Sequence, residues 1–176
     1  MRAAVAAALL AASTMAPVGA QDAPKTAAAN PLAGFGWFAE LAGSCWSGVR
    51  PDGRTTDTQC YLPQYDKLMR GTVKVTVTGE EKPIFEGDAV FALDPKDAKK
   101  AAYSQWGSGG FYATGEITIE GDRLVFHSRQ IDGKPAPLRH IWRRTGANSF
   151  RVTREGEEDS KWVEVFSVDY KRVPGK

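Results

Sequence analysis

The segment from Leu41 to Tyr61 constrains the fold more than any other part of the chain. It holds both cysteines, Cys45 and Cys60, on either side of the sequence Pro51-Asp52-Gly53. Proline, aspartate and glycine in succession favour a tight turn between two strands. The segment therefore predicts a β-hairpin whose two arms a Cys45–Cys60 disulfide would join.

Two turn geometries are compatible with this hairpin. If Asp52-Gly53 is a two-residue loop, the cysteines are equidistant from it and lie opposite one another, but Pro51 then occupies the loop-closing pair without an amide to donate. A type I turn followed by a glycine bulge suits Pro51-Asp52-Gly53 equally, and it shifts the pairing by one residue. A disulfide therefore predicts the tight loop or a compensating bulge, with Trp46 inward and Cys45 outward in both cases.

The N-terminus has the features of a secretory signal peptide. Met1-Arg2 is basic, an apolar run follows, and Val18-Gly19-Ala20 is a small-residue cleavage site. The apolar run is shorter than the roughly 20 residues that cross a bilayer, and no later stretch reaches that length. Residues 1–20 are therefore predicted to be removed near Ala20, which yields a periplasmic or secreted protein without an integral membrane segment.

The predicted compartment and the small number of possible metal ligands both favour a disulfide over other roles for the cysteines. Exported proteins meet an oxidising environment, in which paired cysteines are usually bonded. A metal site needs more ligands than Cys45 and Cys60 supply, and the chain has 2 histidines. A catalytic thiol needs a base within reach, for which there is no local signature. No metal site is predicted.

Charge and composition indicate one domain and argue against a nucleic-acid partner. The chain has 23 Lys and Arg against 21 Asp and Glu, whereas a dedicated nucleic-acid binder usually has a strongly basic field. Residues 21–34 are small, polar and interrupted by proline, which is typical of a flexible tether. Residues 35–173 are long enough for a single domain with its own core.

Helical spacing gives way to strand spacing at Gly43. The apolar residues between Phe35 and Leu41 have helical spacing and predict a short helix. Beyond Gly43 the pattern alternates with period two, most clearly over 72–77, and short Gly, Pro, Asp and Asn turns interrupt it. Counting both arms of the hairpin predicts about ten antiparallel strands, and closure into an up-and-down barrel removes their edges. A β-sandwich is the alternative, although no long crossover connection is visible.

The entry into the first strand, Leu41-x-Gly43-x-x-Trp46, and the final Tyr170-Lys171-Arg172 resemble the calycin-like barrels. These include lipocalins, fatty-acid-binding proteins, nitrobindin-like barrels and small exported bacterial proteins of the same plan. The resemblance implies a cup closed at one end by the N-terminal helix, with Trp46 packed at that end and room inside for one small apolar ligand. Nitrobindin-like barrels make haem a minor alternative, but no local motif matches their haem-ligand region, so no cofactor is predicted.

The two histidines are predicted to face opposite sides of the sheet. If Phe126 faces the core, strand alternation places His127 outside and, on the next strand, His140 and Trp142 inside. A lone inward histidine is more often a hydrogen-bonded core residue than a catalyst, and a ligand contact is the alternative. On the last strand, Glu164 is either a buried carboxylate in need of a partner or a solvated one.

Arginines are frequent in the second half of the chain and predict a positive side of the barrel. A solvated face with nearby acids explains them most simply, and an anionic partner is the alternative. The members are Arg139, Arg143, Arg144, Arg151 and Arg154.

The sequence lacks the motifs of the established reaction classes, so no catalytic residue is predicted. The leading hypothesis is a non-enzymatic exported barrel that binds a small apolar or amphipathic molecule. An enzyme that uses His140 and Glu164 as an acid-base pair, and a structural or inhibitor-like envelope protein that binds another protein, are the alternatives. The oligomeric state is not predicted. The predicted ligand-binding residues are Trp46, Tyr103, Phe126, His140 and Trp142.

Overall fold

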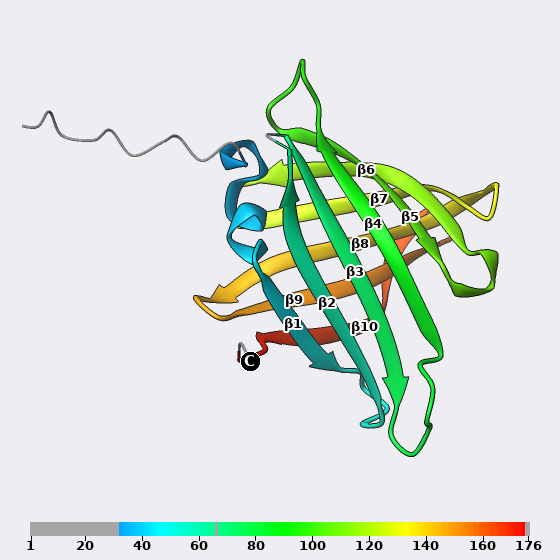
Figure 1. The fold of residues 1–176 in the computed structure, drawn as a ribbon. Helices are drawn as coiled ribbons and strands as arrows, with labels where there is room; N and C mark the ends of the chain where they lie inside the picture. The colour runs from blue at the N-terminus through cyan, green and yellow to red at the C-terminus, as the bar shows by residue number, and fades with distance from the viewer. Residues whose placement is uncertain (1–31, 66, 175–176) are drawn as a thin grey trace, which may run out of the picture.

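The computed structural model describes residues 32–65 and 67–174, which form a closed antiparallel β-barrel (Figure 1). The strands of this described part are β1 (Ser44–Val49), β2 (Thr55–Gln64), β3 (Leu68–Val77), β4 (Phe85–Leu93), β5 (Lys100–Gly107), β6 (Tyr112–Glu120), β7 (Arg123–Ile131), β8 (Lys134–Gly146), β9 (Ser149–Glu158) and β10 (Lys161–Arg172). Each strand pairs with its neighbours in sequence, and β1 pairs with β10 to close the barrel. The predicted all-β, up-and-down barrel is confirmed, because every connection within it is a short hairpin.

The predicted N-terminal helix is a 3-10 segment, η1 (Ala33–Leu41), which begins two residues earlier than expected. It bends at Gly36, whose φ of 58° is in the left-handed region that favours glycine. η1 lies across one end of the barrel (Figure 1), and Phe38 is fully buried there. A second 3-10 turn, η2 (Ser108–Gly110), connects β5 to β6.

Phe38 joins η1 to the barrel wall. Its ring lies 5.1 to 6.0 Å, centroid to centroid, from four aromatic rings on four different strands, each close to perpendicular. Edge-to-face contacts of this kind add to the free energy gained by burying the rings. The four partners are Tyr61, Phe91, Phe126 and Trp142. The η1 end of the barrel is therefore filled by aromatic side chains.

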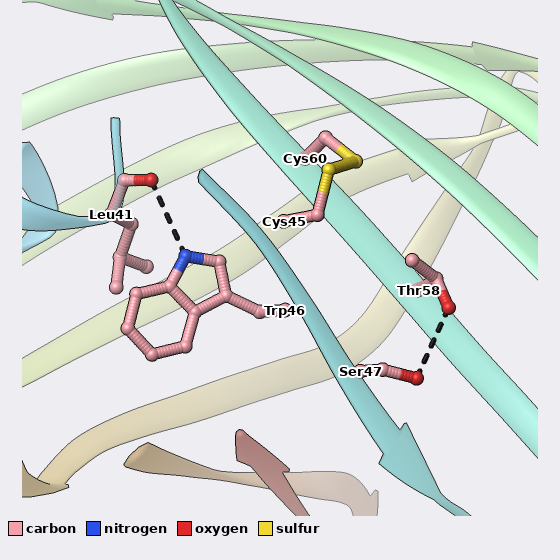
Figure 2. The surroundings of a disulfide bond; sticks show 6 residues. All are labelled: Leu41, Cys45, Trp46, Ser47, Thr58 and Cys60. Atoms are coloured by element: carbon pink, nitrogen blue, oxygen red, sulfur yellow. Dashed lines mark hydrogen bonds between the residues drawn. A yellow bond between two sulfur atoms is a disulfide. The ribbon is translucent and has the colours of Figure 1, made fainter. Parts of the chain in front are cut away.

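The opening hairpin has the predicted disulfide but a different turn. Cys45 is paired directly with Cys60 and bonded to it, while Trp46 points to the opposite side of β1 (Figure 2). The register is kept by a four-residue loop, 51–54, because the amide of Arg50 donates to the carbonyl of Thr55 over 2.8 Å. Pro51 thus lies outside the ladder, where its missing amide costs nothing. Both predicted geometries, the two-residue loop and the compensated bulge, are therefore wrong.

Asp52 holds this loop in shape. Its carboxylate accepts hydrogen bonds from the amides of Arg54 and Thr55, over 2.9 and 2.8 Å, and from the Thr55 hydroxyl. The Thr55 and Arg54 hydrogen bonds lower the pKa of Asp52 to about 2. The loop therefore fixes the position of Arg50, which leads into it.

The seam between β1 and β10 is short and depends on a glycine. The paired residues are Trp46 with Arg172 and Ser47 with Lys171. A Cβ atom on Gly48 would lie 2.4 Å from Cγ1 of Val168, closer than real Cβ atoms come. A residue without a side chain is therefore required where the last strand crosses the first.

The predicted signal peptide, residues 1–20, lies outside the described residues. So do residues 21–31 of the predicted tether, which was expected to extend to residue 34. Leu32, which was assigned to the tether, is 3% exposed and belongs to the core cluster. Within the part that the structure describes, no helix is long and apolar enough to span a membrane.

Candidate functional site: the barrel cavity

An internal cavity of about 350 Å³ occupies the half of the barrel away from η1. That volume lies at the lower end of the range for small-molecule sites. Its walls come from β2 to β9 and the residues beside them; at the end of the barrel opposite η1 they include Phe85, the first residue of β4, and the loop residues Ile84 and Phe111. Phe85 and Phe111 meet edge to face there, with ring centroids 5.4 Å apart. The aromatic filling thus stops part of the way along the barrel.

Four of the five residues predicted to bind ligand border this cavity: Tyr103, Phe126, His140 and Trp142. The predicted register of β7 and β8 is confirmed, since Phe126 pairs with His140 and both face inward. Ligand binding by these residues stays a prediction.

Trp46 is placed elsewhere, at the η1 end of the barrel. It is 2% exposed, its indole Nε1 donates to the carbonyl of Leu41 over 3.3 Å (Figure 2), and its ring packs on Phe150. Packing at the closed end accounts for its position.

The apolar wall of the cavity contains a run of aromatic rings in contact. Trp142 is tilted against Phe126, with centroids 4.6 Å apart, and Tyr103 is tilted against the other side of the run at 5.8 Å from Phe126. Trp142 is also stacked on Phe150, a core residue outside the cavity lining, at 5.2 Å. The hydroxyl of Tyr103 is within 2.9 Å of that of Ser128, so this polar group on the wall is satisfied. Flat, rigid rings of this kind bind apolar molecules at a small cost in side-chain entropy.

A polar network lies along the β2 side of the cavity. Asp57 is 8% exposed, and its carboxylate accepts a hydrogen bond from Nε2 of Gln59 over 3.2 Å. Gln59 also donates to the hydroxyl of Tyr170, over 3.0 Å, and accepts from that of Tyr61. Burial raises the pKa of Asp57, against the opposing effects of the Gln59 hydrogen bond and the charge of Arg50.

Two arginines enter the same region from different elements. Arg50 follows β1, Arg154 lies on β9, and their guanidinium carbons are 5.7 and 5.8 Å from the centroid of the Phe166 ring. The closest contact of Arg50 with Asp57 is 3.5 Å, between Nη2 and Oδ2. Burial and the neighbouring charge of Arg50 lower the pKa of Arg154. Positive charge is therefore concentrated at one place on the cavity wall.

His140 is an uncharged member of the wall at neutral pH. Burial, and then the positive charge of Arg154, lower its pKa to about 4. It pairs across β8 and β9 with Arg154, so both side chains face the cavity.

Glu164 does not meet His140, because the last strand is irregular. The pairing of β10 with β9 shifts between Glu164 and Phe166. From Phe166 onward, every second residue of β10 faces inward. Glu164, before the shift, is exposed and accepts a hydrogen bond from the Ser167 hydroxyl over 2.6 Å. Of the two readings of Glu164 left open by the sequence, the solvated one is confirmed.

The predicted arginine face is divided between the two sides of the sheet. Arg139, Arg144 and Arg151 pair with Glu155, Glu40 and Asp169, as expected for a solvated face with nearby acids. Arg154 does not belong to that face, because it lies on the inner side with Phe150 and Val152, four and two residues earlier in β9.

Sequence reasoning missed Arg50, Asp57, Gln59 and Arg154 as cavity residues. For Asp57 and Gln59 the signal was period two counted back from the buried Tyr61. Arg154 could have been found in the same way from Phe150. For Arg50 the signal was period two counted forward from Trp46 through Gly48, and the ladder reaches Arg50 because its amide donates to the carbonyl of Thr55.

The comparisons with known proteins support the fold alone. The chain matches no family model, and no curated protein is a significant match. Among solved structures it is similar to a crystal structure of Rv2717c from M. tuberculosis, with 13% identity, a TM-score of 0.56, and coverage of 80% of this chain and 98% of that one. A redesigned β-barrel, b11L5F_LGL, is 9% identical with a TM-score of 0.39, over 78% of this chain and 94% of that one. The protein is thus a closed ten-stranded antiparallel barrel with a structural neighbour of the same fold.

Proposed function

We propose that this protein is an exported, non-enzymatic barrel that binds one small apolar or amphipathic molecule in its internal cavity. The observation that carries the proposal is the cavity itself, since a scaffold whose only role was structural would be expected to fill its interior with side chains. The cavity combines a run of aromatic rings with a few polar groups gathered on one side, which is the usual composition of small-molecule sites.

Two observations favour binding over the catalytic alternative considered above. The acid-base pair considered for an enzyme, His140 with Glu164, is separated by the sheet, since the carboxylate is outside. Among the described residues, no group of three or more His, Cys, Asp or Glu side chains is placed to hold a metal ion. Binding uses the cavity without requiring either arrangement.

Export is part of the proposal and rests on the disulfide and the N-terminal sequence. The Cys45–Cys60 bond is of the kind that persists in oxidising compartments. Native mass spectrometry of protein purified from its source tests export and ligand binding in one measurement. We expect a mature chain that begins at Gln21 and carries one small molecule, and a haem adduct would identify the minor alternative. An uncleaved chain would contradict export.

A titration with Nile red, a neutral apolar dye, tests the cavity directly. We expect saturable binding of one dye per chain, and at least tenfold weaker binding in Ala113→Trp, because Ala113 is a small residue on the cavity wall. Ala102→Trp is the matched control, since Ala102 is exposed on the outer side of β5. Thermal melts establish that each variant is folded. If Ala113→Trp does not fold, Phe126→Ala, which enlarges the cavity, replaces it as the second variant. Absence of saturable binding to the unmodified protein, or equal binding by both tryptophan variants, would contradict the proposal.

A further inference from the structure

The ionisable groups on the cavity wall do not balance. Among the described residues that line it, Asp57 is the one carboxylate, and it faces two guanidinium groups, those of Arg50 and Arg154. Of the acids outside this lining, Asp52 is close enough to Arg50 for their charges to interact, whereas Glu155 and Glu164 lie on the outer side, where they contact Arg139 and Ser167. Among the lining residues, one positive charge is therefore in excess.

The two guanidinium groups also have unused donors. Nε of Arg50 and Nε of Arg154 are both buried without a hydrogen-bond partner in the described part of the chain. Arg50 reaches Asp57 only at 3.5 Å, and the Arg154 side chain has no ion pair within that part. Both side chains are partly exposed, but a buried donor without a partner costs free energy, and an ordered water or a ligand that accepts from it removes that cost.

Geometry places these donors together. Both guanidinium groups lie within 6 Å of the Phe166 ring centroid, 5.7 Å for Arg50 and 5.8 Å for Arg154, and the charge of Arg50 helps to lower the pKa of Arg154, so the two groups share one region of the wall. An oxyanion between them would neutralise the excess charge and accept from both. Arginine is the side chain best suited to that task, because its planar fork matches the two oxygens of a carboxylate.

We propose that Arg50 and Arg154 bind the head group of a singly charged amphipathic anion, such as a carboxylate, whose apolar body lies against the rings of Phe126 and Trp142. The single excess charge of the wall selects a monoanion over a dianion. This inference rests on the proposed binding function and specifies the class of ligand. The arginines select charge, and the aromatic wall accommodates the apolar body.

Paired ligands that differ only in the head group test the inference. Decanoate and decan-1-ol are titrated by calorimetry into the unmodified protein and into Arg154→Gln at pH 8, where decanoate is ionised. We expect decanoate to bind more tightly than the alcohol, and Arg154→Gln to weaken decanoate about 10- to 100-fold, as is typical when a charged hydrogen bond is lost. Binding of decan-1-ol should change by less than about twofold.

Arg151→Gln is the matched control, since Arg151 lies on the same strand but is exposed and paired with Asp169 outside the barrel. It should alter neither titration. Arg154→Gln has a second signature, because removal of a partly buried charge without a carboxylate partner should raise the melting temperature of the ligand-free protein. A residue with a merely structural role would lower that temperature when replaced.

The outcomes separate the inference from the proposed function. If Nile red and decan-1-ol bind but decanoate has no advantage, or if Arg154→Gln weakens both ligands equally, the anion site is refuted and the carrier remains. If neither ligand nor the dye binds the unmodified protein, both proposals fail. Arg50→Gln, read in the same way, replaces Arg154→Gln if that variant does not fold.

Discussion

At the scale of single residues, the inside of the barrel is controlled by a few polar side chains placed among aromatic rings. His140 and Arg154 are paired across β8 and β9, and Asp57 lies on β2 with its carboxylate near Arg50. Each is held in an ionisation state that burial and its neighbours decide. The state of His140 has a measurable effect on stability.

Replacement of His140 by glutamine should reduce the decrease in the free energy of unfolding that occurs as the pH falls. The folded pKa of about 4 lies below the unfolded value of 6.5, so the unfolded chain binds the proton more readily. The contribution of neutral His140 is complete above pH 6.5 and is lost as the pH falls towards 4. At about 1.4 kcal/mol per pKa unit, its upper limit is about 3 kcal/mol.

Urea unfolding at pH 7.5 and 4.5 measures this effect as the difference between the unmodified protein and His140→Gln. Because carboxylates also titrate in acid, only that difference reports on His140. His127→Gln, on the outer face of β7, should follow the unmodified protein. Equal pH dependence in all three proteins would show that His140 is not the group responsible.

At the scale of elements, the hairpin of β1 and β2 is fixed from three sides. The disulfide joins its arms, Asp52 shapes its loop, and β10 packs against Gly48. The sequence was sufficient to predict the hairpin and the bond. The loop that sets its register was not predictable, because a four-residue loop and a bulged turn use the same residues.

Removal of the disulfide in a Cys45→Ala, Cys60→Ala double variant should destabilise the protein without unfolding it. The bond closes a loop with a sequence separation of 15, for which the loss of chain entropy predicts about 3 kcal/mol. The barrel should persist because the β1–β2 ladder extends beyond the cysteines on both sides. Urea unfolding with and without reducing agent measures the loss, and reducing agent should affect only the unmodified protein. A double variant as stable as the oxidised protein would contradict the expectation.

At the scale of the whole molecule, the barrel is divided into a filled half and a hollow half. The rings carried by η1 fill one end, and the cavity begins where they stop. Phe38 lies at that boundary, in contact with rings that also line the cavity, among them Phe91 and Trp142. The same side chain therefore stabilises the fold and supports the rings that line the site.

Phe38→Ala should lower the free energy of unfolding by about 3 to 5 kcal/mol, the usual cost of removing a fully buried ring. Glu40→Ala is the control from the same segment, because its exposed pair with Arg144 should contribute about 1 kcal/mol or less. Denaturant unfolding followed by tryptophan fluorescence measures both. A similar loss in the two variants would argue against a central role for Phe38.

The sequence by itself determined the all-β class, the number of strands, the closure and the disulfide, because period-two alternation, short turns and cysteine spacing are properties of neighbouring residues. The tertiary structure alone decided which side chains reach the cavity. A single irregularity between Glu164 and Phe166 moves a carboxylate to the outside. A period-two pattern can show that Arg154 faces inward, but the cavity combines side chains from β2 to β9, so no local pattern could reveal which of them meet.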